Sequence, residues 1–212
     1  MSRYKAIAIV GIHTGIGKTI SSAVIAEAIG ADYWKPVQAG LEERDTATVQ
    51  RLITNGAARV HPEAVQLSMA ASPHTAAAAA CIVIDYTLFQ WPVTDQLLLV
   101  ETAGGVLSPM TATATMADFV AHNNLPALLV SQNYLGSINH TVLSIEVLKG
   151  RGIPILGIIM NGPQDQSSES FIEQYTGVPV IARIPQFHPL TVQAVAHRAA
   201  EIQTKLCDAL ID

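Results

Sequence analysis

Gly11-Ile-His-Thr-Gly-Ile-Gly-Lys-Thr19 is the stretch of sequence that decides the fold. It follows the apolar run Ala6–Val10 and leads into the helical pattern Thr19–Ile29, so it joins a strand to a helix. In that context a glycine-rich loop binds phosphate, because its backbone N–H groups curl round the anion and the helix N-terminus adds a positive end. Counted from Gly11, the spacing is one residue longer than Gly-x4-Gly-Lys-Thr. A turn without any ligand is the alternative, and the Gly-Lys-Thr ending argues strongly against it.

Two side chains at the end of this loop have direct chemical uses. Lys18 would neutralise the β and γ phosphates of a nucleotide, and the Thr19 hydroxyl would bind magnesium. The sequence therefore predicts ATP as a ligand and Mg2+ as its cofactor.

Further apolar runs recur along the chain without polar alternation, as is typical of strands buried on both faces of a parallel sheet. They span Leu97–Val100, Ala127–Val130, Ile155–Met160 and Val178–Ile184. Helical patterns separate them, most clearly Ile138–Lys149 and Leu190–Leu210. This alternation predicts an α/β fold of the P-loop NTPase type, with a doubly wound, mostly parallel sheet and helices on both faces. The length fits a single ATP-binding domain over residues 1–212.

Composition excludes several classes of protein. The net charge of -5 argues against a nucleic-acid partner, which would need a basic face. The longest apolar stretch, Ala76–Ile84, is far shorter than a membrane span and is better explained as a packed helical turn. The N-terminal apolar run is too short for a signal peptide. We therefore expect a cytoplasmic protein without membrane contacts, with Cys81 and Cys207 reduced.

Polar residues follow the ends of the proposed strands. Gly11, Lys35, Glu101, Gln132-Asn133, Asn161 and Pro185 all lie there. Ligands of open α/β sheets bind outside the carboxyl ends of the strands. We therefore expect these groups to meet at one edge of the sheet and to form the site.

Two acids are candidates for completing the magnesium site. Glu101 directly follows a buried run and precedes Thr-Ala-Gly-Gly105, a flexible turn of phosphate size, although it could be a solvated loop acid. Asp45 opens the helical segment Asp45–Ile53, so a helix N-cap is an equally good interpretation.

Lys35, in Trp34-Lys-Pro-Val37, could stabilise charge on a transferring group or could be a surface lysine. His74 in Ser72-Pro-His74 is either a turn residue or a ligand contact. The histidines have no spacing that suggests a zinc site. Asn161 could read adenine through its amide or could simply form a turn with Gly162.

Motifs along nearly the whole chain resemble those of the dethiobiotin synthetase family. The most specific are Lys35-Pro-Val-Gln38 and Gly136-x-Ile-Asn-His140, because the P-loop alone is shared with many other proteins. The others, in order, are Gly11-x-x-Thr-x-Ile-Gly-Lys-Thr19, Ser72-Pro-His74, Glu101-x-Ala-Gly-Gly105, Gly157-x4-Asn161 and Ile184-Pro185.

The resemblance implies an ATP-dependent ligase that closes a cyclic urea. In that family carbon dioxide adds to an amine of 7,8-diaminopelargonate, ATP phosphorylates the carbamate, and the second amine displaces phosphate. By resemblance Thr14, Lys18 and Lys35 are catalytic, and Thr19, Asp45 and Glu101 hold Mg2+. Gly136, Ser137, Ile138 and Asn139 would bind the substrate carboxylate, together with Lys35, across a homodimer interface. The nucleotide would contact Gly15, Ile16, Gly17, Lys18, Thr19, Ile20, Asp45, Glu101, Thr102, Ala103, Gly104, Asn161, Gly162, Pro185, Gln186 and Phe187.

The chain departs from the family pattern at a few positions. Ala39 stands where the family has a serine or threonine that contacts substrate, so the affinity for the diamine is in question. Ile12-His13 replaces Thr-Asp or Thr-Gly, and Thr102 and Ala182 replace glycines.

Three other functions compete with this interpretation. A partition-type ATPase switch would have a lysine where His13 stands. A corrin amidating synthase would need a glutaminase domain that 212 residues cannot contain. A nucleotide-binding module without turnover is favoured only by Ala39.

Overall fold

The computed structural model describes residues 3–211, and its centre is a seven-stranded sheet in the order β4-β2-β6-β1-β7-β8-β9. Every neighbouring pair in this sheet is parallel. The strands are β1 Ala6–Gly11, β2 Asp32–Trp34, β4 Val60–His61, β6 Leu98–Glu101, β7 Ala127–Gln132, β8 Ile155–Asn161 and β9 Val180–Ile184. A separate pair, β3 Val37–Ala39 and β5 Val65–Leu67, is also parallel. The predicted doubly wound parallel sheet is confirmed.

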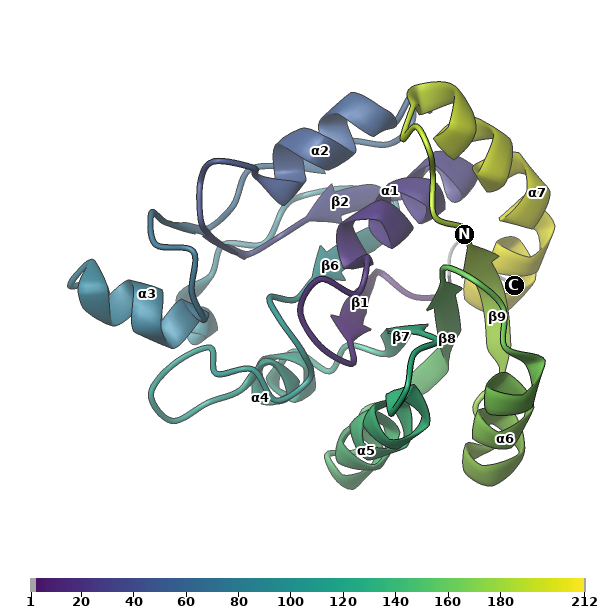
Figure 1. The fold of residues 1–212 in the computed structure, drawn as a ribbon. Coiled ribbons are helices and arrows are strands. Elements are labelled where there is room, and N and C mark those ends of the chain that lie inside the picture. Colours follow the sequence, from purple (N-terminus) through teal and green to yellow (C-terminus); the bar gives the residue numbers. More distant parts are fainter. Residues whose placement is uncertain (1–2, 212) are drawn as a thin grey trace.

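Helices cover both faces of the sheet (Figure 1). They are α1 Lys18–Ile29, α2 Asp45–Leu52, α3 Pro73–Ala79, α4 Met116–His122, α5 Ser137–Gly150, α6 Gln166–Thr176 and α7 Val192–Leu210, with a short 3-10 turn at Tyr86–Leu88. Side chains from α1, α2 and α7 form one apolar core with one face of the strands. Helices α4, α5 and α6 supply the other core. The sheet therefore separates two hydrophobic cores that share its strands.

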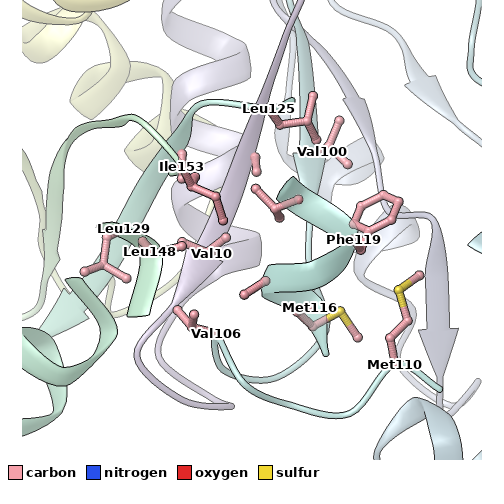
Figure 2. Close-up of a cluster of buried hydrophobic side chains, with 14 of the residues drawn as sticks. Val10, Val100, Val106, Met110, Met116, Phe119, Leu125, Leu129, Leu148 and Ile153 are labelled. Carbon is pink, nitrogen blue, oxygen red and sulfur yellow. The ribbon is translucent and has the colours of Figure 1, made fainter. Parts of the chain in front are cut away.

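Figure 2 shows part of the second core. Val10, Val100 and Leu129 come from β1, β6 and β7, three adjacent strands, and they pack with Phe119 of α4 and Leu148 of α5. All five side chains are almost completely buried. The same three strands pair in parallel register, so their carboxyl ends lie at one edge of the sheet.

The strand order explains where a ligand can reach the sheet. The chain runs from β1 outward to β2, returns to β6 beside β1, and then crosses to β7 on the other side of β1. At such a switch point the loops after neighbouring strands diverge and leave a crevice at the carboxyl ends. Among residues 3–211, no helix has the length and apolar character needed to cross a membrane.

Candidate active site

The P-loop connects β1 to α1 and takes its shape from two glycines. Gly15 and Gly17 have φ angles of 70° and 91°, in the left-handed region that other residues enter only with strain. Gly17 has a second requirement, because a Cβ atom there would lie 2.1 Å from Nδ2 of Asn161. Asn161 in turn donates from Nδ2 to the carbonyl of Ile16 at 3.0 Å. The loop is thus bound to the end of β8 as well as to its own strand and helix.

Lys18 is the first residue of α1, and its side chain lies back across the loop. Its Nζ donates to the carbonyl of Gly104 at 2.6 Å and lies 3.4 Å from that of His13. Burial lowers the pKa of Lys18 from its ordinary value, and the opposing effect of Glu101 does not reverse the shift. Hydrogen bonds to two carbonyls hold the ammonium at the loop, where it would meet phosphate oxygens.

Glu101 is the last residue of β6 and is 1% exposed. Its Oε2 accepts hydrogen bonds from Ser22 Oγ and Tyr33 OH, each at 3.0 Å. Its Oε1 accepts from Thr19 Oγ1 at 3.0 Å. The predicted alternative of a solvated loop acid is therefore wrong, since Glu101 is buried and fixed in orientation. Burial and the Glu101 carboxylate raise the pKa of Tyr33 far above its ordinary value, so Tyr33 stays a donor.

Asp45 begins α2, but its carboxylate faces the P-loop. Thr19 Oγ1 donates to Asp45 Oδ1 at 2.6 Å, and Lys35 donates to Oδ2. The N-cap position is occupied by Arg44, so the interpretation of Asp45 as an N-cap is wrong. The backbone N–H of Asp45 lies 3.3 Å from Oε1 of Gln38, which helps to place the start of the helix.

Lys35 lies between the two acids, directly after β2. Its Nζ contacts Asp45 and lies 3.3 Å from Glu101 Oε1, and the residue is 6% exposed. Burial by itself lowers the pKa of Lys35, but the carboxylates of Glu101 and Asp45 outweigh it and the net shift is upward. The surface-lysine alternative is therefore wrong, and Lys35 is a buried ammonium throughout the neutral pH range.

Thr19, Asp45 and Glu101 converge where the sequence predicts the magnesium site, so their chemistry shows whether the ion would fit. Thr19 Oγ1 lies within hydrogen-bonding distance of an oxygen of Asp45 and of Glu101, and all three oxygens belong to the hard donor class that Mg2+ prefers. No group of three or more His, Cys, Asp or Glu residues able to hold a metal occurs in residues 3–211. Two acids and a hydroxyl suit Mg2+ because this ion commonly takes its remaining ligands from water and substrate phosphates. The donor set fits the ion.

A cavity of about 480 Å³ opens beside these groups. Thr14, Lys35, Asp45 and Gly104 form its polar side. The rest of the lining is mainly small residues: Gln38, Ala39, Ala70, Ala71, Ser72, Pro73, Ala103 and Ser108. A small or slender molecule in this cavity would meet the P-loop and Lys35 together. His74, at the rim of another cavity, shares a hydrogen bond with Ser72 at the start of α3, as a turn residue would.

The loops after β8 and β9 adjoin each other at the far end of the P-loop. The N–H of Gly162 donates to the carbonyl of Ile184 at 2.7 Å. Pro185 and Gln186 are exposed and Phe187 is half-buried. The predicted adenine-contact residues after these two strands are therefore brought together, next to Asn161.

At two other predicted contact regions, the start of α5 and Thr102, a polar group is already hydrogen-bonded within the chain. At the start of α5 the N–H of Ser137 donates to the carbonyl of Tyr134 at 2.9 Å, so it is already used within the chain. Ile138 and Asn139 supply the next N–H groups of this first turn, where helices lack internal partners. The Thr102 hydroxyl donates to the carbonyl of Ile9, so it connects the end of β6 to β1.

Comparison with known proteins gives the family. Residues 5–194 match a family model described as an AAA domain. The ATP-dependent dethiobiotin synthetase BioD of Cytophaga hutchinsonii is 42% identical over 195 residues, which cover 92% of this chain and 95% of the relative. That of Nitrobacter hamburgensis is 44% identical over 186 residues, 87% of this chain and 88% of the relative. This chain belongs to the ATP-dependent dethiobiotin synthetases. The predicted family is confirmed, and with it the ligase class.

Solved structures share the fold of this dethiobiotin synthetase family member at low identity. The Pyrococcus furiosus cell division ATPase MinD is 17% identical with a TM-score of 0.59, covering 97% of this chain and 98% of that chain. A putative plasmid partition protein from Borrelia burgdorferi is 9% identical with a TM-score of 0.57 and covers 98% of both chains. These likenesses confirm the P-loop fold, and they carry no argument for a partition function.

Sequence reasoning missed three residues that organise the synthetase site. Ser22 and Tyr33 orient Glu101, and Gln38 braces Asp45. Ser22 could have been found, because it lies three residues after Thr19 and so on the same face of α1. Gln38 stands in the Lys35-Pro-Val-Gln38 motif, which marked it without suggesting a role. Tyr33 had no signal beyond its place in a short strand.

Proposed function

We propose that this dethiobiotin synthetase forms its product at the cavity between the P-loop and Lys35. The supporting observation is the convergence of Lys18, Lys35, Asp45 and Glu101 on one edge of the sheet, beside a cavity of about 480 Å³. A 7,8-diaminopelargonate amine in that cavity would lie next to the phosphates of ATP. The enzyme would bring together ATP, the diamine and carbon dioxide or bicarbonate.

The P-loop and Lys18 bind the phosphates of ATP in this mechanism. The N–H groups of the loop and the α1 N-terminus face the oxygens, and the Lys18 ammonium follows negative charge as it shifts during phosphoryl transfer. Thr19, Asp45 and Glu101 would hold Mg2+. When bound, this ion neutralises charge on the β and γ oxygens.

Lys35 acts on the carbon side of the reaction. One amine nitrogen of the diamine bonds to carbon dioxide and loses a proton, which gives a carbamate. A carbamate oxygen then attacks the γ phosphorus and ADP leaves, so that a carbamic-phosphoric anhydride forms. The second amine attacks the carbonyl carbon, phosphate departs and the ring closes. The buried ammonium of Lys35 stabilises the anionic carbamate and the departing phosphate, because charges interact strongly away from water.

The loops after β8 and β9, here called the base loops, would bind the adenine at one end of the site. A second subunit would complete the other end, where the substrate carboxylate binds. Asn161 uses one N–H for the carbonyl of Ile16, and its remaining N–H and oxygen match the N7 acceptor and N6 donor of adenine. The first turn of α5, Gly136–Asn139, would receive the substrate carboxylate from the cavity of a second copy in a homodimer. Because the reaction consumes ATP, we infer that it takes place in the cytoplasm.

A product assay tests this function. Purified protein is incubated with the diamine, labelled bicarbonate, ATP and MgCl2, and dethiobiotin and released phosphate are quantified together. We expect one phosphate for each dethiobiotin and almost no phosphate without the diamine. ATP hydrolysis that ignores the diamine would instead indicate a switch ATPase, and binding of ATP without any hydrolysis would indicate a module without turnover.

A further inference from the structure

Outside the phosphate site, the chain buries a second charged group beneath the base loops. Glu169 of α6 is 4% exposed and accepts three hydrogen bonds. Its Oε1 accepts from Asn133 Nδ2 at 2.6 Å and from the N–H of Asp165 at 3.2 Å. Its Oε2 pairs with the guanidinium of Arg183. We call Asn133, Glu169 and Arg183 the Glu169 cluster.

The Glu169 cluster joins the carboxyl ends of three neighbouring strands. Asn133 directly follows β7, and its Nδ2 also donates to the carbonyl of Pro163 at 3.0 Å in the loop after β8. Arg183 lies in β9, two residues before the exposed Pro185. Helix α6 lies beside α5 in Figure 1, and Glu169 in its first turn contacts Asn133 after β7 and Arg183 of β9. The Glu169 carboxylate therefore anchors the loop that starts at Asn161, directly at Asp165 and indirectly through Asn133.

We propose that Glu169 is a positioning residue for recognition of the adenine base. Glu169 holds the loop directly at the N–H of Asp165 and, through Asn133, at the carbonyl of Pro163, and so it sets where Asn161 points relative to the P-loop. This inference rests on the proposed role of Asn161 as the residue that reads adenine.

The chemistry of the cluster requires a carboxylate at this position. All three partners are donors, and a carboxylate can accept from all of them because it has no hydrogen of its own. A glutamine at position 169 has one oxygen and one NH2 group. Whichever way it turns, the NH2 group meets either Arg183 or Asn133 and Asp165, donor against donor. Glutamine thus keeps the shape of the side chain but loses the hydrogen bonds to the partners of one of the two oxygens.

The cost of the cluster argues that it does more than add stability. Oδ1 of Asn133 and Nη1 of Arg183 are buried without a hydrogen-bond partner among the described residues. Buried ion pairs seldom stabilise a fold better than apolar residues of the same size would, and unpaired atoms add to the penalty. A group retained at that cost is best explained by the geometry it imposes on the loop above it.

The test compares the binding of two nucleotides to two variants of one helix. Affinities of the intact protein for ATP and for GTP are measured by calorimetry at fixed Mg2+, without the diamine. For Glu169→Gln we expect ATP affinity to fall about tenfold or more and the preference for ATP over GTP to shrink, because the base loop loses its fixed position. Affinity for inorganic triphosphate, which has no base, should stay the same.

Glu173→Gln is the matched control. Glu173 lies one turn along α6, and its Oε1 accepts from the N–H of Val180 at 2.7 Å, at the other end of β9. The same loss of charge on the same helix lies far from the base loop, and the glutamine oxygen can still accept from the Val180 N–H, so its base preference should remain that of the wild type. Equal losses of ATP and triphosphate affinity in Glu169→Gln, or an unchanged base preference, would overturn the proposal.

Two further variants keep the outcome decisive. Asn133→Ala removes the bond to Pro163 but leaves the pair of Glu169 with Arg183, and it should reduce base preference even if Glu169→Gln folds poorly. Asn161→Asp tests the function on which the inference rests. If Asn161→Asp leaves base preference intact, adenine reading by Asn161 is wrong. If Asn161→Asp removes base preference while the cluster variants keep it, only the positioning role is wrong.

Discussion

Lys35 shows how a buried ammonium keeps its charge between two acids. Burial disfavours its charge, but two carboxylates within reach reverse that effect, and the pKa rises. The charge therefore persists without water around it. Such a charge stabilises an anion forming in the cavity more effectively than a hydrated surface lysine would.

Lys35→Gln should separate catalysis from nucleotide binding. Because Lys35 lines the cavity and is proposed to stabilise the carbamate, we expect turnover to fall by about a hundredfold or more, as for other preorganised electrostatic groups. ATP affinity should change by less than about threefold, since the P-loop and Lys18 remain. Single-turnover rates and equilibrium ATP binding are the two measurements. Parallel losses in both would make Lys35 another phosphate contact.

Ala39→Ser should tighten binding of the diamine. Ala39 lines the cavity next to Gln38, where the family commonly has a hydroxyl, so the serine would add one hydrogen bond to the substrate. One hydrogen bond contributes about 1 kcal/mol, which corresponds to roughly fivefold in KM for the diamine. The KM for ATP is the internal control and should not move. An unchanged KM for the diamine would show that the substrate passes position 39 without contact.

The residue types of the site could be predicted from sequence, but their orientation could not. Lys18, Lys35 and Glu101 were expected to meet because each follows a strand or opens a helix at the same sheet edge. Which oxygen of Glu101 faces Thr19 depends on Ser22 and on a tyrosine from β2, and thus on packing between elements. The Glu169 cluster could not be predicted either, because it depends on contacts between separate elements; only Asn133 was expected at a strand end.

At the scale of elements, long periodic segments were predicted well and short ones were not. The runs Ala6–Val10 and Ile155–Met160 each differ from the observed strand by one residue. Strands β3, β4 and β5 have two or three residues, too few to show any period. Helix α6 was missed because its sequence is polar and only Ile172 reaches complete burial among its apolar residues.

Helix α1 supplies a test of how elements are joined. Glu27, near its end, accepts hydrogen bonds from the N–H and hydroxyl of Thr54 and from the N–H of Asn55, just beyond α2. Burial alone would raise the pKa of Glu27, but these bonds outweigh it and the pKa falls below its ordinary value of 4.5. The stabilisation is therefore complete above that value and is lost as the pH falls through the lowered pKa.

Glu27→Gln should accordingly destabilise the protein at neutral pH and lose this effect in acid. We expect the free energy of unfolding to drop by about 1–2 kcal/mol at pH 7, the size of hydrogen bonds to a charged group. Urea titrations at several pH values should show the difference from wild type shrinking as the pH falls below the ordinary value of 4.5 and through the lowered pKa. Glu146→Gln, an exposed change on α5, serves as control. A difference that stays constant with pH would exclude the carboxylate as its cause.

For the whole molecule, the two hydrophobic cores share one sheet and should unfold together. Strands β1, β6, β7, β8 and β9 contribute side chains to both cores, so neither core can persist once the strands separate. We propose that residues 1–212 form one cooperative domain, and calorimetry should give a single transition with equal calorimetric and van't Hoff enthalpies. A homodimer would add a rise of the midpoint temperature with protein concentration. Two resolved transitions would show separate domains.

The bond between Asn161 and the carbonyl of Ile16 has a consequence for the size of molecule that the site admits. It fixes the interval between the phosphate loop and the base loop, since no side chain can be inserted at Gly17 to widen it. With the proposed phosphate and adenine contacts, the site would therefore accept nucleotides of only one length. We expect an ATP analogue with one extra methylene between ribose and phosphate to bind more weakly, because it could contact only one of the two loops in the proposed geometry.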